Sequence, residues 1–133
     1  MCYIYNNIVR LMVLKHFPSE TRLSNNCIYK SINLLQLKEI YKLELAKFMH
    51  KAYYKALPEC LNNMFTRINT VHRYPTSSST NRVFYQHRTM TVAYRNWVSS
   101  AGVDLWATID SSLRECNFFI FRKRYREYLI NSY

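Results

Sequence analysis

Residues 34–55, LLQLKEIYKLELAKFMHKAYYK, form the longest stretch of the chain without glycine, proline or a cluster of asparagine and serine. The apolar residues of this stretch recur at helical spacing. At 100° per residue, one face collects Leu37, Tyr41, Leu45, Phe48 and Ala52, with Ile40 and Met49 at its flanks. A helix of this length spans roughly 33 Å, the width of a small domain. We therefore predict a long helix whose apolar face lies in the core.

Lysines occupy the other side of this predicted helix. Lys47, Lys51 and Lys55 follow one another at intervals of four residues and therefore share one side. Glu44 precedes Lys47 by three residues, which favours an ion pair worth about 0.2–0.5 kcal/mol. By itself the helix indicates no catalytic chemistry.

The composition limits the fold class. One glycine and three prolines in 133 residues are too few for the tight turns of an all-β fold, whereas 49% hydrophobic residues are ordinary for a globular protein. The length corresponds to one domain with its own core. We therefore predict a single, mainly α domain over residues 1–133, with about five helices around the long central helix and a small β-hairpin.

Two shorter helices are predicted beside the long one. The first covers residues 4–15 and should end near Pro18. Its expected inner face consists of Ile4, Ile8, Leu11 and Met12. After it, a loop over residues 19–33 is expected to hold one helical turn at 27–32. A second short helix is expected to begin with Pro58 at its first position.

The middle of the chain is predicted to contain a loop and two strands. Residues 69–82, NTVHRYPTSSSTNR, are too polar to bury a core, so we expect a loop that is mobile over about 74–82. Short runs of β-branched and aromatic residues follow at about 83–87 and 96–100. These runs predict the two strands of the hairpin.

The last third of the chain is predicted to be helical. A helix over 103–109 should follow Gly102, the only glycine, and its inward residues should be Val103, Trp106 and Ile109. Ser112 and Glu115 match a capping box. The closing helix is expected over 117–130, with Lys123 and Glu127 as an i,i+4 pair. Its apolar stripe consists of Phe118, Phe121, Tyr125, Tyr128 and Leu129.

The charge of the chain points to its partner. Nineteen lysines and arginines against eight acidic residues give a net charge of +11 and an isoelectric point near 9.7. A domain with this imbalance repels itself, so a polyanionic partner is expected. Nucleic acid is the first candidate, an anionic membrane surface the second, and an acidic protein the third.

The basic residues are unevenly distributed. Between Cys60 and Val103 the sequence contains no acidic residue and no lysine. The arginines of that segment are Arg67, Arg73, Arg82, Arg88 and Arg95. Aromatic residues lie between them, namely Phe65, Tyr74, Phe84, Tyr85, Tyr94 and Trp97. Arginines bind phosphates and aromatic rings stack on unpaired bases, although the same rings also suit a core with the arginines as its solvated rim.

No active site is evident. Polymerases and nucleases need converging carboxylates that hold metal ions, but the only aspartates, Asp104 and Asp110, are separated and suit helix caps. The phosphate-binding glycine loop, the serine-nucleophile elbow and the zinc-protease helix motif do not occur. We therefore expect a protein that is not an enzyme and needs no cofactor.

The cysteines and the first residues indicate an intracellular protein. The four cysteines, Cys2, Cys27, Cys60 and Cys116, form no C-x-x-C pair and lie apart from the histidines, so a zinc site is not expected. The first residues lack the basic region and cleavage site of a signal peptide, and no apolar run is long enough to span a membrane. A nuclear or cytoplasmic location with reduced thiols is the expectation.

Several blocks of the sequence resemble one family. LLQLKEIYKLELAKFM at 34–49 resembles the C-terminal region of reverse transcriptases from non-LTR retrotransposons, the jockey-like and related LINE-type elements. The likeness continues at Lys51, Leu57, Pro58, Asn62, Phe65, Val71, His72 and Tyr74. NNIVRLM at 6–12 resembles the thumb-side helix, GVDLWATI at 102–109 a Gly-Val-Lys-Leu-Trp-Asn-Ser-Ile block, and FRKRYREYL at 121–129 the closing basic helix.

The likeness has two departures. The family's Tyr-Asn-Thr-Arg is replaced by residues 74–77, Tyr-Pro-Thr-Ser, and its Tyr-Arg-Gly by residues 100–102, Ser-Ala-Gly. Both places lack the family's arginine, so family-like contacts there are not expected.

The resemblance implies nucleic-acid binding without polymerisation. The polymerase centre and the endonuclease domain of the family lie upstream of every block matched here, so we expect a remnant that binds RNA or DNA and cannot extend a primer. It implies further phosphate contacts at Lys47, Lys51 and Lys55 on the long helix. The basic run at 122–126, with Arg122, Lys123 and Arg126, is by its charge pattern either a second phosphate contact or a solvated helix face. Two alternatives stay open: a degenerate reading frame without a partner, and a protein-binding module for an acidic partner.

Overall fold

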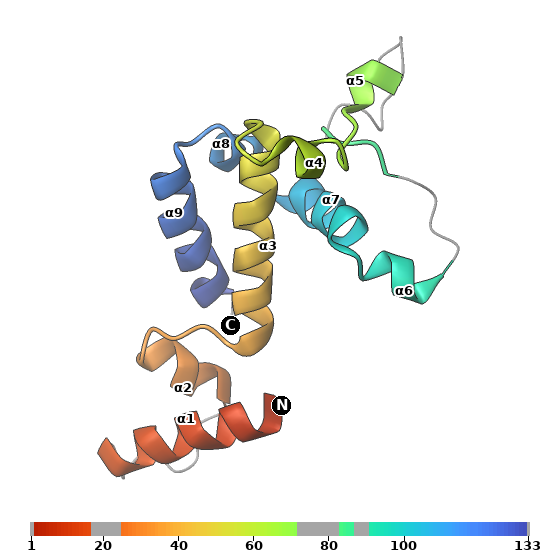
Figure 1. The fold of residues 1–133 in the computed structure, drawn as a ribbon. Helices are drawn as coiled ribbons and strands as arrows, with labels where there is room; N and C mark the ends of the chain where they lie inside the picture. The colour runs from red at the N-terminus through yellow and green to blue at the C-terminus, as the bar shows by residue number, and fades with distance from the viewer. Residues whose placement is uncertain (1, 17–24, 72–82, 87–90, 133) are drawn as a thin grey trace. The chain divides into compact units, whose positions relative to one another are not determined.

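The computed structural model describes residues 2–16, 25–71, 83–86 and 91–132 (Figure 1). These residues are mainly helical, which confirms the predicted fold class. The longer helices are α1 (Cys2–His16), α2 (Asn25–Ser31), α3 (Leu37–Tyr53), α7 (Val98–Thr108) and α9 (Phe118–Asn131). Single helical turns form α4 (Glu59–Asn62), α5 (Ile68–Val71), α6 (Val92–Arg95) and α8 (Ser111–Arg114).

The chain divides into two compact units. Unit 1 comprises Met1–Leu43 and Lys123–Tyr133, and unit 2 comprises Glu44–Arg122. The predicted long helix is α3, although it begins three residues later and ends two residues earlier than expected. The predicted single domain remains a prediction, because this division by contacts does not test it.

In unit 1, α1 and α2 pack through a small core of Val9, Ile28 and Tyr29. The rings of Tyr5 and Tyr29 stack with centroids 6.2 Å apart. The Tyr29 hydroxyl donates a hydrogen bond to Asn6 Oδ1 at 2.6 Å. Because tyrosine combines an apolar ring with a donor that needs a partner, these contacts select the face of α1 that turns inward.

The predicted inner face of α1 was wrong. Its residues are exposed, namely Ile4, Ile8, Leu11 and Met12, while Val9 on another side is buried. α1 is apolar around much of its circumference, so helical spacing alone could not choose between the two faces. The predicted turn at 27–32 lies largely within α2.

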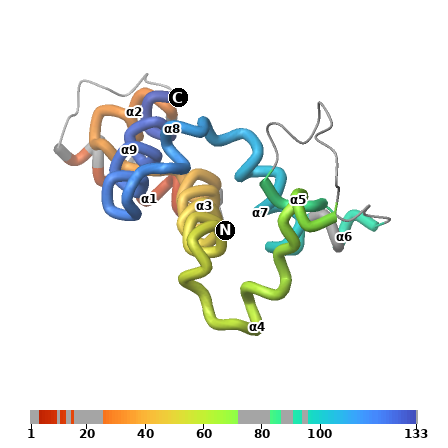
Figure 2. The backbone as a smooth tube through the Cα atoms, turned by 90° about the horizontal axis from the view of Figure 1, so that it is seen from above, coloured from red at the N-terminus to blue at the C-terminus, as the bar shows by residue number. Residues whose placement is uncertain are grey.

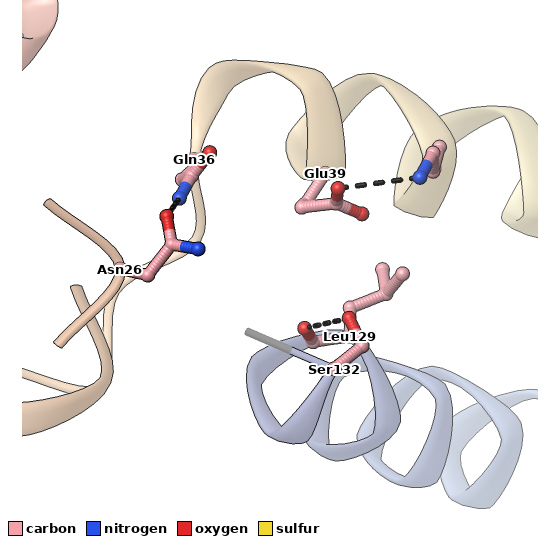
Figure 3. A network of polar contacts seen from close by, with 6 residues as sticks. Asn26, Gln36, Glu39, Leu129 and Ser132 are labelled. Carbon is pink, nitrogen blue, oxygen red and sulfur yellow. Dashed lines mark hydrogen bonds and ion pairs between the residues drawn. The ribbon is translucent and has the colours of Figure 1, made fainter.

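The start of α3 and the end of α9 belong to unit 1, and Figure 3 shows polar contacts around them. Gln36 Nε2 donates to Asn26 Oδ1 at 2.9 Å, and Lys42 Nζ pairs with Glu39 Oε1 at 3.2 Å. Glu39 Oε2 is buried and has no hydrogen-bond partner among the described residues. Tyr125 of α9 is buried too, and desolvation raises its pKa to about 12, so its hydroxyl is neutral at physiological pH.

The inward face of α3 is rotated from the predicted one. Leu45 and Ala52 are buried as expected, but Leu37 and Tyr41 are exposed, by 36% and 54%. Other side chains of α3 complete its buried face, namely Leu43, Ala46, Met49 and His50. The face that turns inward is therefore about one residue step, roughly 100°, from the predicted one.

Within unit 2, the end of α3 and the start of α9 pack through aromatic rings. His50 is buried, and its Nε2 lies 2.9 Å from the carbonyl oxygen of Cys116. Its ring centroid lies 4.6 Å from that of Phe121 and 6.1 Å from that of Trp106. These contacts make His50 a core residue with a backbone hydrogen bond.

α7 confirms the predicted inward residues of this region. Val103, Trp106 and Ile109 are all buried. Gly102 lets α7 approach α3 closely, because a Cβ atom there would lie 2.6 Å from Met49 Sδ and the Met49 side chain would have to shift. The helix begins at Val98, five residues before the predicted start.

The predicted β-hairpin was wrong. Residues 98–100 are the first turn of α7, so they cannot form the second strand. Phe84 instead forms an isolated antiparallel bridge with Arg67. Ile68 N donates to Val83 O at 3.0 Å and Tyr85 N donates to Thr66 O at 2.7 Å. Residues 83–85, which favour β structure, therefore form one isolated bridge with residues 66–68.

Two smaller predictions near α4 and α5 need correction. Pro58 is the N-cap of α4 and not its first helical residue. Residues 69–71 belong to α5 and not to a loop, whereas the rest of the predicted loop, 72–82, lies outside the described residues.

Asp110 caps a helix as predicted, but the predicted capping box at Ser112 and Glu115 was wrong. The N-cap of α8 is Asp110, not Ser112, and its side chain makes no capping bond to the backbone. Ser112 Oγ donates to Asp110 Oδ2 instead. Asp104 lies inside α7 and is not a cap.

The closing helix was predicted well. α9 matches the expected 117–130 to within one residue, and Phe121, Tyr125 and Leu129 are buried as predicted. Tyr128 is 61% exposed, against prediction. Ion pairs among the described residues join Glu39 to Lys42 and Glu44 to Lys47, and the predicted pair of Lys123 with Glu127 does not form.

Candidate nucleic-acid interface

The lysines of α3 differ in what neutralises them. Lys47 Nζ lies 2.8 Å from both carboxylate oxygens of Glu44, which confirms the predicted ion pair. Lys51 is exposed, and its Nζ lies 5.3 Å from the centre of the Phe118 ring. No carboxylate of the described residues forms an ion pair with Lys51. Lys51 therefore carries a positive charge at the surface that is unpaired among the described residues, whereas Glu44 largely neutralises the charge of Lys47.

Lys55 does not lie on the helix with the other two lysines. It follows the end of α3 and adopts a left-handed backbone conformation, with φ of 55°. Lys55 N donates to Ala52 O at 3.2 Å and Ala56 N donates to Lys51 O at 2.8 Å. These are the two hydrogen bonds of a Schellman motif, in which glycine usually occupies the left-handed position.

Arg67 also contacts the end of α3. Its Nη2 donates to the Tyr53 carbonyl oxygen at 2.7 Å, and its guanidinium carbon lies 5.5 Å from the centre of the Tyr53 ring. Arg67 is half-buried and its backbone pairs with Phe84. One of its five N–H groups thus donates to a backbone carbonyl at the end of α3. The other four N–H groups are the donors that Arg67 could direct to a ligand.

Lys55 and Arg67 meet at a pocket of about 550 Å³. The pocket belongs to unit 2, and Figure 2 follows the chain that forms it from the end of α3 through α4 to α5. Its volume lies within the range of about 300–1,000 Å³ that is common for ligand sites. Polar side chains on its wall are those of Glu59, Asn62, Asn63, Thr66 and Thr70.

The wall of this pocket combines apolar rings with amides and charges. Phe65 and Phe84 both line it, with ring centroids 5.6 Å apart. Asn62 Nδ2 donates to the Leu57 carbonyl oxygen at 2.5 Å, which fixes the turn into α4. Asn62 Oδ1 is buried and has no partner among the described residues. Asn63 is exposed and carries a second amide on the same wall.

The basic residues of α9 are mostly at the surface. Arg122, at the end of unit 2, is exposed, and so is Lys123, the first residue of α9 in unit 1. Arg126 is half-buried, and its Nη2 donates to the carbonyl oxygen of Asn33 at 2.8 Å. Arg126 therefore bonds to the backbone at the end of α2, whereas a phosphate contact was the predicted role.

Several predicted site residues are not placed. Arg73, Arg82 and Arg88 lie outside the described residues. Arg95 ends α6, and only its backbone is described. Among the predicted interface residues whose side chains are described, Lys55 and Arg67 line one pocket together.

The aromatic residues between Cys60 and Val103 differ in how far they are buried. Phe84 is 2% exposed and Phe65 packs between it and Phe48, with a Phe48–Phe65 centroid distance of 5.9 Å. Phe84 therefore belongs to the core, which was the alternative to base stacking, whereas Phe65 is only half-buried. Trp97 differs from them because 62% of its surface is exposed.

Sequence reasoning missed the amides and hydroxyls of the pocket. Asn62 and Asn63 follow Pro58 by four and five residues, but nothing in that spacing shows that their side chains face Lys55 and Arg67. The signal that could have found them is their place beside the connection from α3 to α4, because connecting segments often carry binding residues.

Neither a metal centre nor a membrane span was found among the described residues. No three side chains of His, Cys, Asp or Glu gather there as potential metal ligands. None of the helices in residues 2–16, 25–71 and 91–132 has the length and apolarity needed to cross a bilayer.

A scan against protein families, a search of curated proteins and a search of solved structures each found no match for this chain.

Proposed function

We propose that this chain binds single-stranded nucleic acid, RNA or DNA, through phosphate contacts of its basic residues. The observation that carries the proposal is the uneven pairing of its charges. Among the candidate cations that the structure describes, Lys47 is neutralised by a carboxylate, whereas Lys51, Lys55, Arg122 and Lys123 are exposed and have no ion-pair partner there. Unpaired surface cations attract a polyanion and release its counterions on binding.

The resemblance to non-LTR retrotransposon reverse transcriptases supports the same function. It suggests a C-terminal remnant of such a polymerase, which would hold element RNA or a primer–template. The acidic residues support binding and not polymerisation, because Asp104 and Asp110 are the only aspartates and lie in and after α7 without a neighbouring carboxylate in sequence. Detectable extension of a primed template by the purified chain would refute the claim that it is not a polymerase.

Fluorescence anisotropy tests the proposal with a labelled single-stranded RNA and the matching DNA. The affinity should fall linearly with the logarithm of salt concentration between about 50 mM and 200 mM, by about 0.7 in slope for each phosphate contacted. Failure to bind either strand at the lowest salt would contradict the proposal.

A matched pair of variants identifies the cations involved. Lys51→Ala and Lys47→Ala remove the same side chain one helical turn apart, but only Lys51 lacks a carboxylate partner. Lys51→Ala should make the salt slope shallower by about 0.7, whereas Lys47→Ala should change it less. A protein-binding module would behave differently, because one acidic protein would bind tightly while RNA and DNA would not.

A further inference from the structure

Two independent features mark the pocket of unit 2 as more than a gap in the packing. Lys55 holds a left-handed conformation that favours glycine, although its carbonyl and amide would make the same bonds if glycine stood there. Strained backbone of this kind is concentrated at functional sites. On the same wall, the cationic side chains of Lys55 and Arg67 lie beside the aromatic ring of Phe65.

The chemistry of the wall selects a class of ligand. Lys55 and Arg67 supply positive charge against the single carboxylate of Glu59, so the pocket favours an anion. Phe65 supplies an apolar face. A bare phosphate or a carboxylate would use the charges but would leave the apolar face unmatched.

A nucleotide matches all of these groups. Its phosphate provides the negative charge, its base provides a flat ring, and the amino or imino groups of the base provide donors. Asn63 and Thr66 are exposed on the wall and can bind the edge of the base by hydrogen bonds. The hydroxyl of Thr70 donates to the Arg67 carbonyl oxygen at 2.6 Å and keeps its lone pairs for a donor.

We propose that this pocket binds one unpaired nucleotide of the single-stranded nucleic acid, with its phosphate at Lys55 and Arg67 and its base beside Phe65 and Asn63. The inference rests on the proposed function, and adds to it one defined position where a base is bound apart from the general attraction of phosphates.

The test is a titration of the full chain with AMP, CMP, GMP and UMP, followed by ¹H–¹⁵N correlation spectra. Saturable shifts are expected at the amides of Asn63, Thr66 and Thr70. Inorganic phosphate, ribose 5-phosphate and a phosphoserine peptide serve as comparison ligands, and each should bind more weakly than the best nucleotide.

Lys55→Gly is the decisive variant, because it removes the charge and relieves the backbone at the same time. Weaker binding by this variant cannot be attributed to loss of the fold, since glycine suits the left-handed position better than lysine. The affinity for the best nucleotide should drop about tenfold, in keeping with loss of one charge-assisted contact. Lys38→Ala, which removes an exposed lysine that is neither on the pocket wall nor among the proposed phosphate contacts, should leave nucleotide affinity unchanged.

Three results would overturn the inference. One is a phosphate or a phosphoserine peptide that binds as tightly as any nucleotide. Another is shifts that do not saturate or that spread over the basic surface, and the third is equal losses for Lys55→Gly and Lys38→Ala.

Anisotropy with single-stranded RNA on the same samples separates the two proposals. Salt-dependent binding of RNA that no nucleotide competes for would refute the pocket and leave the proposed function standing. Nucleotide binding without RNA binding would refute the proposed function instead.

Discussion

The ends of α2 and α3 have the same backbone hydrogen bonds but different residues at the left-handed position. After α2, Leu34 N donates to Tyr29 O at 2.9 Å and Asn33 N donates to Lys30 O at 3.1 Å. Asn33 has φ of 53°, and Lys55, which takes the same place after α3, has φ of 55°. Both ends are therefore Schellman motifs, one in each unit.

The difference lies in how well each residue suits its place. Asparagine tolerates the left-handed conformation because its short amide bonds locally, whereas a lysine in that conformation costs about 1 kcal/mol or more. The carbonyls of both residues also accept side-chain bonds, from Arg126 to Asn33 and from Asn62 to Lys55. The end of α2 thus looks optimised for stability, while the end of α3 holds a charged residue where stability alone would place glycine.

The largest effect that distinguishes the two ends should come from valine, which is β-branched and strongly disfavours the left-handed region. Asn33→Val should lower the free energy of unfolding by about 2 kcal/mol, and Lys55→Val by about 1 kcal/mol, since lysine is already strained there. Urea unfolding monitored by circular dichroism measures both. Equal losses would show that Lys55 carries no strain.

Glycine should produce the opposite result. Lys55→Gly should raise the free energy of unfolding by about 1 kcal/mol, whereas Asn33→Gly should change it by less than about 0.5 kcal/mol. The same urea titration applies, with the unfolding slope checked for constancy between variants. A Lys55→Gly protein that is less stable than the parent would remove the basis for the comparison.

The side chains that bond to the two carbonyl groups should matter unequally. Asn62→Ala should cost about 1 kcal/mol, because the amide bonds the partly buried Leu57 carbonyl as well as that of Lys55. Arg126→Ala should cost less than about 0.5 kcal/mol, because its bond to Asn33 is exposed. Thermal unfolding of the two variants side by side tests the order, and the reverse order would contradict it.

The smallest predicted change in stability distinguishes the contribution of backbone strain from that of charge at the end of α3. Lys51→Ala removes a cation from the last turn without altering the left-handed residue, so stability should fall by about 0.5 kcal/mol through loss of a favourable helix-end charge. A gain in stability for Lys51→Ala would mean that charge repulsion, not backbone strain, explains the gain expected for Lys55→Gly.

The sequence predicted the parts of the fold that rest on strong local signals. The bounds of α9, the existence of α3 as a long helix and the inward residues Val103, Trp106 and Ile109 follow from helical spacing. The face of α1 could not be predicted in this way, because stacking of Tyr5 on Tyr29 decided it from outside the helix.

The hairpin was predicted wrongly and the pocket was not predicted, and the two have a related cause. β-branched and aromatic residues near Phe84 favour a strand, but the partner that forms is Arg67, earlier in the chain, and Val98 begins a helix. The charges of Lys55 and Arg67 were identified from the sequence, but their meeting at one pocket depends on the turn at φ of 55° that ends α3. A sequence pattern does not report such a turn when the residue is lysine.

The salt dependence of single-stranded RNA binding tests nucleic-acid binding most directly. If three or more of the unpaired cations contact phosphates, a plot of the logarithm of affinity against that of salt concentration should have a slope of about −2 or steeper. A slope near zero, or no binding at about 50 mM salt, would contradict binding through phosphate contacts.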